Sequence, residues 1–296
     1  IGANATNLLA TQEYTAHSTR GDTGLTIAPD GSDKPAAGLT YDYITEYSYG
    51  IMESFNLFAP RFMGGSNAED IGKDSEIYDS LLKLGASPAQ AANFTENAPT
   101  YWGDQPYVGA PAYIGATVLF LFIFALYLVR GRLKWWIVGG SVLALILSWG
   151  KNFEFFTEFF INYVPLYSKF RAVSSIQVII ELCVPVLAVF GLYKLFDPKL
   201  QKEVKVHALK WSGIIVGGIG IALLLFRSVL FDFSGAGDSA LIQQMGVDFL
   251  RSLKEDRQAI YTEDLIRSLI FSALTAAALW LYIEKKITQN WLVPAL

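Results

Sequence analysis

The sequence predicts an all-α polytopic membrane protein with about five transmembrane helices, an irregular extracytoplasmic N-terminal cap and amphipathic outer helices. Charged residues make up only 17% of the chain, against about 25% in soluble proteins, and the mean hydropathy is +0.34. Apolar residues concentrate in long runs after residue 111. These features exclude a single water-soluble domain. A net charge of −4 with a pI near 5.3 also excludes a nucleic-acid binder, which needs a basic surface.

Five apolar runs are candidates for the transmembrane helices, because a helix needs about 20 mostly apolar residues to cross the hydrocarbon core. They cover residues 112–129, 135–149, 174–196, 211–231 and 265–283. The second run is short, but Trp135, Trp136 and Trp149 at its ends suit the two interfacial belts. The chain therefore divides into residues 1–111, the expected cap region, and residues 112–296, the transmembrane helical region.

The distribution of Lys and Arg orients these helices. The loops at residues 130–134 and 197–210 and the tail from residue 284 hold nine Lys and Arg in 32 residues. The segments on the opposite side, residues 1–111, 151–173 and 232–264, hold 11 in 167. The positive-inside rule places the first set in the cytoplasm, so residues 1–111 are expected outside.

Residues 1–111 are expected to pack as a cap on the outer helix ends. They hold too many aromatic residues for a disordered tail, and glycines and Pro99 divide them into short pieces. Within this region, residues 75–84 could form a short helix, and the remainder has a loop-like pattern.

Two further outer segments have the spacing of amphipathic helices. Residues 152–164 carry Phe153, Phe156, Phe160 and Tyr163 at intervals of three and four. Residues 239–256 repeat apolar side chains in the same way, after Ser239 as a plausible N-cap. Each segment could lie among the lipid headgroups or pack against the protein itself, and the sequence leaves both alternatives open.

Ionisable side chains inside a span are costly and are therefore functional candidates. Glu181 lies in the third span, with Gln177 one turn before it on the same helical face, and Pro185 is expected to kink the helix. We expect Glu181 to face Arg227, near the outer end of the fourth span, because sequential spans are usually neighbours. A purely structural ion pair or hydrogen-bond network is the alternative role for these residues.

Lys169, Arg171 and Arg227 could form a basic cluster at the outer membrane surface, where a lipid phosphate would lie. A guanidinium suits phosphate because it donates two parallel hydrogen bonds. Basic side chains at helix ends also commonly snorkel to headgroups without a specific ligand, which is the alternative here.

Several chemistries find no support in the sequence. The single cysteine, Cys183, lies in an apolar run and indicates a buried side chain, and His17 and His207 lack partners at metal-ligand spacing. No Ser-His-Asp set, P-loop or dinucleotide-binding motif is present, so no metal site or cofactor is predicted. Gly213 and Gly217 have the spacing typical of close helix packing inside a membrane.

Eight short motifs follow one another along nearly the whole chain. They are Thr11-Gln-Glu-Tyr14, Ser18-Thr-Arg-Gly21, Glu46-Tyr-Ser-Tyr-Gly50, Pro60-Arg-Phe-Met-Gly-Gly65, Tyr101-Trp-Gly103, Tyr113-Ile-Gly115, Val164-Pro-Leu-Tyr-Ser-Lys-Phe-Arg171 and Glu255-Asp-Arg257. In this order they resemble the YfhO-type bacterial membrane proteins, particularly forms from Bacteroidetes. The chain starts at Ile1 rather than Met, and residues 290–293 look like the start of another apolar segment, so we expect an internal fragment.

The resemblance implies a glycosyltransferase of the GT-C class in the bacterial cytoplasmic (inner) membrane. Such a protein would transfer sugar from a polyprenyl-phosphate-linked donor to a cell-envelope glycan or polymer acceptor on the outer face. The class usually carries its catalytic acid in the first outer loop, which would precede Ile1, so no catalytic residue is carried over. The outer acids Glu13, Asp42, Glu46 and Asp104 are candidates for acceptor or metal contact by location only.

Two other functions stay open. In a lipid or solute transporter or flippase, Glu181 and the kink at Pro185 would belong to the moving parts, although the internal repeats common in transporters are not visible. A non-catalytic envelope assembly factor is the third possibility. Membrane lipid is a partner in all three.

Overall fold

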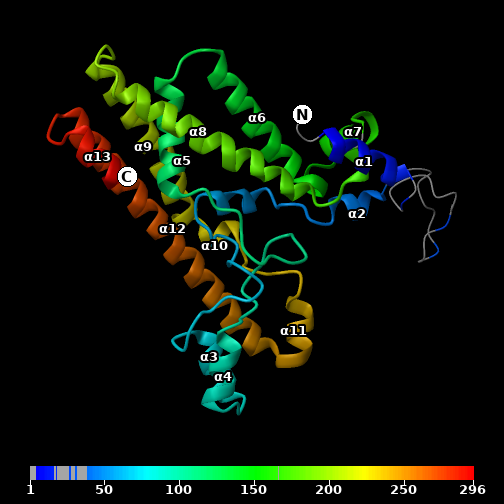
Figure 1. The fold of residues 1–296 in the computed structure, drawn as a ribbon. Coiled ribbons are helices and arrows are strands. Elements are labelled where there is room, and N and C mark those ends of the chain that lie inside the picture. Colours follow the sequence, from blue (N-terminus) through cyan, green and yellow to red (C-terminus); the bar gives the residue numbers. More distant parts are fainter. Residues whose placement is uncertain (1–4, 17, 19–26, 28–30, 32–38, 166) are drawn as a thin grey trace.

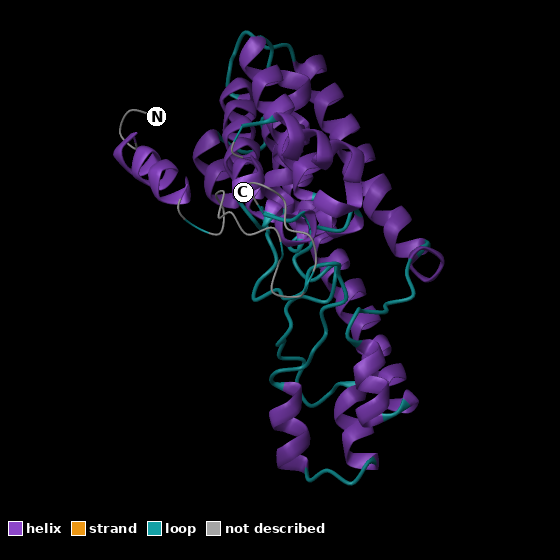
Figure 2. Cartoon of the chain, turned by 90° about the vertical axis from the view of Figure 1, so that its right-hand side faces the viewer, coloured by secondary structure: helices purple, strands orange, loops and turns teal. Residues whose placement is uncertain are grey.

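The computed structural model describes residues 5–16, 18, 27, 31, 39–165 and 167–296, and every regular element in these ranges is a helix. Figure 1 shows a bundle of long helices, and Figure 2 shows α3 and α4 extending away from it beside one end of α12. The α-helices are α1 (Ala5–Ala16), α2 (Tyr41–Thr45), α3 (Glu76–Lys83), α4 (Pro88–Thr95), α5 (Ala116–Leu128), α6 (Arg132–Ser148), α7 (Glu154–Tyr163), α8 (Gln177–Leu195), α9 (Lys202–Leu225), α10 (Arg227–Leu230), α11 (Asp238–Met245), α12 (Val247–Ile283) and α13 (Gln289–Ala295). Four 3-10 helices cover Met52–Leu57, Gly150–Phe153, Tyr167–Lys169 and Val173–Ile176.

Three helical segments of the described chain are long and apolar enough to cross a membrane: Val173–Leu195, Lys202–Leu225 and Val247–Ile283. A fourth results if α6 and the helices over Gly150–Tyr163, bent by 110° from it, count as one broken span. Helix α5 has 13 residues and is therefore about 20 Å long, shorter than the hydrocarbon core of about 30 Å. The structure thus gives three to four candidate spans, and the third predicted span is reproduced almost residue for residue.

Short α5 lies in the middle of the bundle. It packs against α8, α9 and α12, and its Phe120 and Phe124 are fully buried. A Cβ atom placed on Gly191 of α8 would lie 2.5 Å from the Cβ of Ala125, so this glycine allows the close approach of α8 to α5. Helix α5 therefore separates α8 from α9, although these two follow each other in the sequence.

The expected pairing of Glu181 with Arg227 is wrong. Glu181 lies on α8 and Arg227 begins α10 at the end of α9, on the other side of α5. No ion pair or hydrogen bond of the described residues joins the two side chains. The rule that sequential spans are neighbours fails here because α5, which comes earlier in the chain, occupies the place between them.

Helix α12 is a single helix of 37 residues, about 55 Å long. The predicted outer helix over residues 239–256 is divided between α11 and α12 at Gly246, whose φ of +90° is favourable only for glycine. The outer part of α12 then continues without a break into the predicted fifth span. Its buried Phe249 and Leu253 pack against α3 and α4, so packing against the protein, not lipid contact, explains this apolar face.

The helix expected over residues 75–84 is confirmed as α3. Its N-cap Ser75 accepts a hydrogen bond from the amide of Tyr78, and the Asp256 carboxylate of α12 accepts from the amides of Glu76 and Ile77, both at 2.9 Å. Helix α4 was not predicted, although Ser87, Pro88 and Gln90 form a capping box with proline at the first helical position, which is a recognised start signal.

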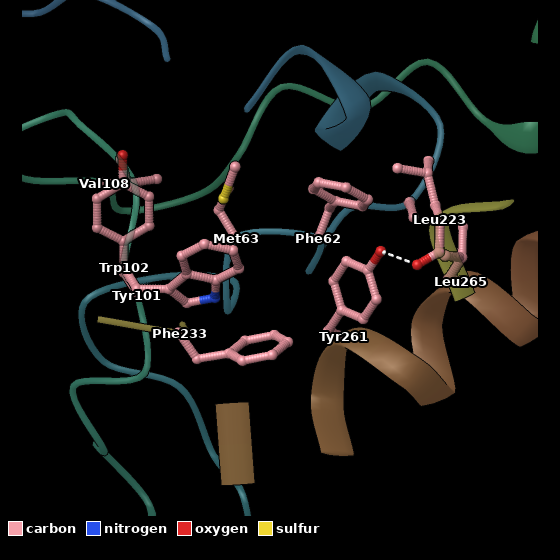
Figure 3. Close-up of a cluster of buried hydrophobic side chains, with 10 residues drawn as sticks. Phe62, Met63, Tyr101, Trp102, Val108, Leu223, Phe233, Tyr261 and Leu265 are labelled. Carbon is pink, nitrogen blue, oxygen red and sulfur yellow. Dashed lines mark hydrogen bonds between the residues drawn. The ribbon is translucent and has the colours of Figure 1, made fainter. Parts of the chain in front are cut away.

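Aromatic side chains join residues 39–111, which we call the N-terminal segment, to the end of α9 and to the middle of α12. Figure 3 shows Phe62, Trp102 and Phe233 gathered around Tyr261 of α12, whose hydroxyl donates to the Leu223 carbonyl at 3.0 Å. We call this end of the bundle, where α5 and α8 begin and α9 ends, the distal end. The N-terminal segment is thereby fixed on the distal end through an apolar core.

Two smaller expectations have different outcomes. The side chains of Phe155, Phe159 and Tyr163 on α7 are exposed, so lipid contact by this helix stays a prediction. The close helix packing expected for the glycines of the fourth span, Gly213, Gly217, Gly218 and Gly220, is found in part. A Cβ at any of the first three would meet no atom within 4 Å. The close approach is at Gly220, where a Cβ would lie 2.5 Å from Leu269 of α12.

Candidate functional site

A cavity of about 440 Å³, which we call the distal cavity, lies between the N-terminal segment, the helix Gly150–Phe153 and the chain around α10. Its lining combines acids, an amide, aromatic rings and backbone: Gly50, Ile51, Met52, Glu53, Met63, Trp102, Gly103, Asp104, Asn152, Leu230, Phe231 and Ser234. A concave site with an apolar wall and a few convergent polar groups is the usual form of a small-molecule site.

The exposed polar wall is built by Asp104 and Asn152. The Asn152 Nδ2 atom donates to Asp104 Oδ2 at 3.2 Å and to the Tyr49 carbonyl at 2.8 Å. A Cβ on Gly50 would lie 2.6 Å from the same Oδ2 atom. Any other residue at position 50 would therefore displace the Asp104 carboxylate. The Asn152 amide and the absence of a side chain at Gly50 together orient Asp104 at the cavity.

Behind this wall, the fully buried side chain of Glu53 connects Gly50, Tyr101 and Gln105. Its carboxylate accepts hydrogen bonds from the Tyr101 hydroxyl at 2.7 Å, from Gln105 Nε2 at 3.0 Å and from the Gly50 amide at 3.0 Å. Burial raises the pKa of Glu53, and these hydrogen bonds oppose that increase. Burial and the neighbouring carboxylate raise the pKa of Tyr101, so Tyr101 stays a hydrogen-bond donor to Glu53.

The aromatic wall is made by Trp102 and Phe231, whose ring centroids are 5.5 Å apart. The indole Nε1 atom of Trp102 is buried and has no hydrogen-bond partner, although an indole N–H is a donor that usually finds one. An unsatisfied buried donor at a cavity needs an explanation. A ligand hydroxyl or carboxyl oxygen would supply it.

This arrangement suits a polyhydroxylated ligand. Carboxylate and amide groups exchange hydrogen bonds with hydroxyl groups, and the apolar faces of a pyranose ring can pack on aromatic rings. Among the described residues no group of three or more His, Cys, Asp or Glu side chains could hold a metal ion. The lining of the distal cavity offers hydrogen bonds and ring contacts to such a ligand.

Comparisons of the chain with family models, curated proteins and solved structures found no match. The geometry of the site and the sequence motifs therefore carry the functional argument.

The residues predicted to hold a lipid phosphate have different surroundings. Arg171 Nη1 donates to the Tyr43 hydroxyl at 2.6 Å, and its guanidinium lies 5.0 Å from the ring centroid of Tyr43. Lys169 ends the helix Tyr167–Lys169 nearby in the sequence, whereas half-buried Arg227 begins α10. Their grouping around one phosphate stays a prediction.

Glu181 and Gln177, which were predicted to lie on one helical face, do lie together. Both line a second cavity of about 520 Å³ at the start of α8, together with Tyr49, Tyr113, Ser174 and Ser175. We call this the α8 cavity.

Sequence reasoning identified only part of the distal cavity. Of the outer acids selected by location, Asp104 lines it, whereas Glu13, Asp42 and Glu46 do not. Trp102, Asn152 and Glu53 were not predicted as site residues. The dense run from Tyr101 to Asp104, which places two aromatic residues, a glycine and an acid in succession, was the available signal for Trp102.

Proposed function

We propose that this chain is part of an integral membrane glycosyltransferase-like protein. It would transfer sugar from a polyprenyl-phosphate-linked donor to a cell-envelope acceptor on the outer face of the bacterial cytoplasmic membrane. The observation that carries the proposal is the distal cavity of about 440 Å³, which is lined by the Asp104 carboxylate, by the Asn152 amide that orients it and by Trp102, whose buried indole N–H has no partner. The motifs that resemble YfhO-type proteins support the same class of substrate.

The proposed membrane arrangement puts the distal end outside. The basic loops at residues 130–134 and 197–210 and the tail after residue 284 connect or follow helices at the opposite end of the bundle, and the positive-inside rule assigns that end to the cytoplasm. In this arrangement the N-terminal segment caps the outer face. The count of five spans would require α5 and the bent α6–α7 pair each to act as one crossing.

In the proposed complex, the saccharide lies in the distal cavity and the donor phosphate lies in the outer headgroup layer. Asp104 and Asn152 would orient sugar hydroxyls, and the rings of Trp102 and Phe231 would hold the sugar face. Lys169, Arg171 and Arg227 are the proposed contacts of the phosphate, since each can donate to phosphate oxygens. No residue of this chain is assigned as the catalytic acid.

The experiment compares cells with and without the full-length gene, using mass spectrometry of polyprenyl-phosphate sugars and of envelope glycans. A transferase predicts that its loss removes a glycan substituent while the lipid-linked sugar accumulates. Asp104→Asn should reproduce this phenotype in part, and Glu96→Gln, which changes an exposed acid outside the cavity, should not. Unchanged glycans and lipid-linked sugars in the deletion strain would contradict the proposal.

The transporter or flippase alternative is favoured by one feature, an exposed Glu181 beside Pro185 inside α8. Full-length protein in proteoliposomes with a polyprenyl-phosphate sugar and an acceptor separates the two functions. A transferase forms a covalently glycosylated acceptor, whereas a flippase only redistributes the lipid between leaflets. A non-catalytic assembly factor would do neither.

A further inference from the structure

The α8 cavity, about 520 Å³ in volume, is connected to the distal cavity through Tyr49, which lines the α8 cavity and whose carbonyl accepts a hydrogen bond from Asn152 of the distal cavity. It opens between the start of α8 and the chain that leads into α5, residues 110–113. Its polar lining comes from Tyr49, Tyr113, Ser174, Ser175, Gln177 and Glu181. No basic side chain lines it, which distinguishes it from an anion site.

Gln177 has a buried acceptor without a partner. The side chain is only 3% exposed, and its Nε2 atom donates to Ser148 Oγ at 3.2 Å. Ser148 Oγ donates its own hydrogen to the Leu145 carbonyl at 2.7 Å, so it can only accept from Gln177. In this arrangement the amide nitrogen of Gln177 faces Ser148 and the amide oxygen faces away from it. The Oε1 atom is thereby left buried and unpartnered.

Glu181 is the second acceptor. It follows Gln177 by one helical turn, about 6 Å along the axis, and lines the same cavity. Among the described residues its carboxylate has neither an ion pair nor a hydrogen bond. A carboxylate near the hydrocarbon layer without a partner is unfavourable, so a cationic group from outside this part of the chain would stabilise it.

The surrounding groups restrict the ligand further. Tyr49 is close enough to Glu181 that the carboxylate, after burial and Glu53, contributes to raising the pKa of its hydroxyl. Tyr49 and Tyr113 also offer aromatic rings, which attract cations. The cavity therefore combines one negative charge, one unpartnered carbonyl oxygen and aromatic rings, and it lacks a positive charge.

We propose that the α8 cavity binds a protonated primary amine, with Glu181 and the Oε1 atom of Gln177 accepting two of its three hydrogen bonds. An ammonium group has three donors and no acceptor, which complements this lining. A trimethylated ammonium keeps the charge but has no donor. The amine could be carried by an ethanolamine phospholipid of the same leaflet or by an amino sugar in solution, and both present the same group. The inference does not depend on the proposed sugar transfer.

The test uses full-length protein in detergent and native mass spectrometry. It is titrated separately with a phosphatidylethanolamine, with the phosphatidylcholine of the same acyl chains and with glucosamine. We expect one of the two primary amines to bind at least about tenfold more tightly than phosphatidylcholine, the difference expected for lost charge-assisted hydrogen bonds. Preference for the phospholipid identifies a lipid source, and preference for glucosamine identifies a saccharide source.

Two variants assign the binding to the cavity. Glu181→Gln should weaken binding of the preferred amine by about tenfold or more, whereas Glu158→Gln, which changes an exposed acid on α7, should leave it unchanged. Equal binding of phosphatidylethanolamine and phosphatidylcholine, with no binding of glucosamine, would overturn the proposal even if a variant failed to fold. Equal effects of the two variants would overturn it as well. Sugar transfer measured on the same preparations shows separately whether the proposed function holds.

Discussion

Arg257 of α12 and Asp238 of α11 form a buried ion pair, with Nη1 and Oδ2 2.8 Å apart. The same guanidinium donates to the carbonyl of Thr100 in the N-terminal segment at 3.0 Å and to that of Phe233 at 2.9 Å. One side chain therefore holds together the long helix, the chain before α11 and the loop that carries Trp102. The aromatic wall of the distal cavity depends on this arrangement.

The first prediction concerns this ion pair. Arg257→Met should lower the free energy of unfolding by about 3–5 kcal/mol, because it leaves Asp238 buried without its partner. The measurement is thermal or denaturant unfolding of purified full-length protein. Arg251→Met, which removes an exposed arginine paired only with exposed Asp248, is the control. Equal destabilisation by the two substitutions would show that the buried ion pair contributes no more to the free energy of unfolding than the exposed one.

The second prediction concerns the position of Asp104. Gly50→Ala should reduce sugar transfer by about tenfold, because its Cβ would displace the Asp104 carboxylate from the position that orients the ligand. Gly109→Ala is the matched control, since its Cβ would lie no closer than 3.8 Å to a neighbouring atom. Transfer to the acceptor in proteoliposomes measures both. Full activity of Gly50→Ala would show that Asp104 is not part of the binding site.

The third prediction is a pH dependence caused by Glu53. Because burial raises the pKa of this carboxyl in the folded protein above the ordinary value of 4.5, folding favours its protonated form. Its contribution to stability is fully present below that ordinary pKa and is lost as the pH rises through the folded-state pKa. Wild-type protein should therefore lose stability relative to Glu53→Gln over this range. If the melting temperatures of the two proteins changed with pH in the same way from acid to neutral pH, this result would contradict the assignment.

The fourth prediction concerns the orientation in the membrane. In a Cys183→Ala background, Ala89→Cys on α4 should react with an impermeant maleimide in intact cells. Gln201→Cys, before α9, should react only after the membrane is opened. Both positions are exposed in the fold, so accessibility to the reagent is decided by the membrane. The reverse labelling pattern would place both cavities on the cytoplasmic side and contradict the proposed function.

The helical fold class and the third span follow directly from the sequence, because an apolar run of about 20 residues has few alternatives to a buried or membrane-spanning helix. The arrangement of the helices does not. Helix α5 lies between α8 and α9 through side-chain packing at Gly191 and Ala125, which periodicity cannot reveal. The continuous α12 was missed because charged residues in its outer half interrupt the apolar run, while they lie on a helix that packs against α3.

The candidate site shows the same limit. Glu181 and Gln177 were predicted together because one helical turn brings them to one face. The distal cavity, in contrast, joins residues from five separate parts of the sequence, around Gly50, Met63, Trp102, Asn152 and Phe231. Such long-range proximity follows from tertiary packing. The expected contact between Glu181 and Arg227 failed for the same reason, since it assumed a neighbour relationship that α5 prevents.

The most direct test of the proposed function is photo-cross-linking of the full-length protein with a polyprenyl-phosphate sugar that carries a diazirine on its sugar ring. The labelled peptides are then identified by mass spectrometry. We expect labels around residues 102–104 and around Asn152, which line the distal cavity. We expect Asp104→Asn to reduce these labels and Glu96→Gln to leave them unchanged. Labels confined to segments outside the distal cavity, or labelling that Asp104→Asn does not change, would contradict the account.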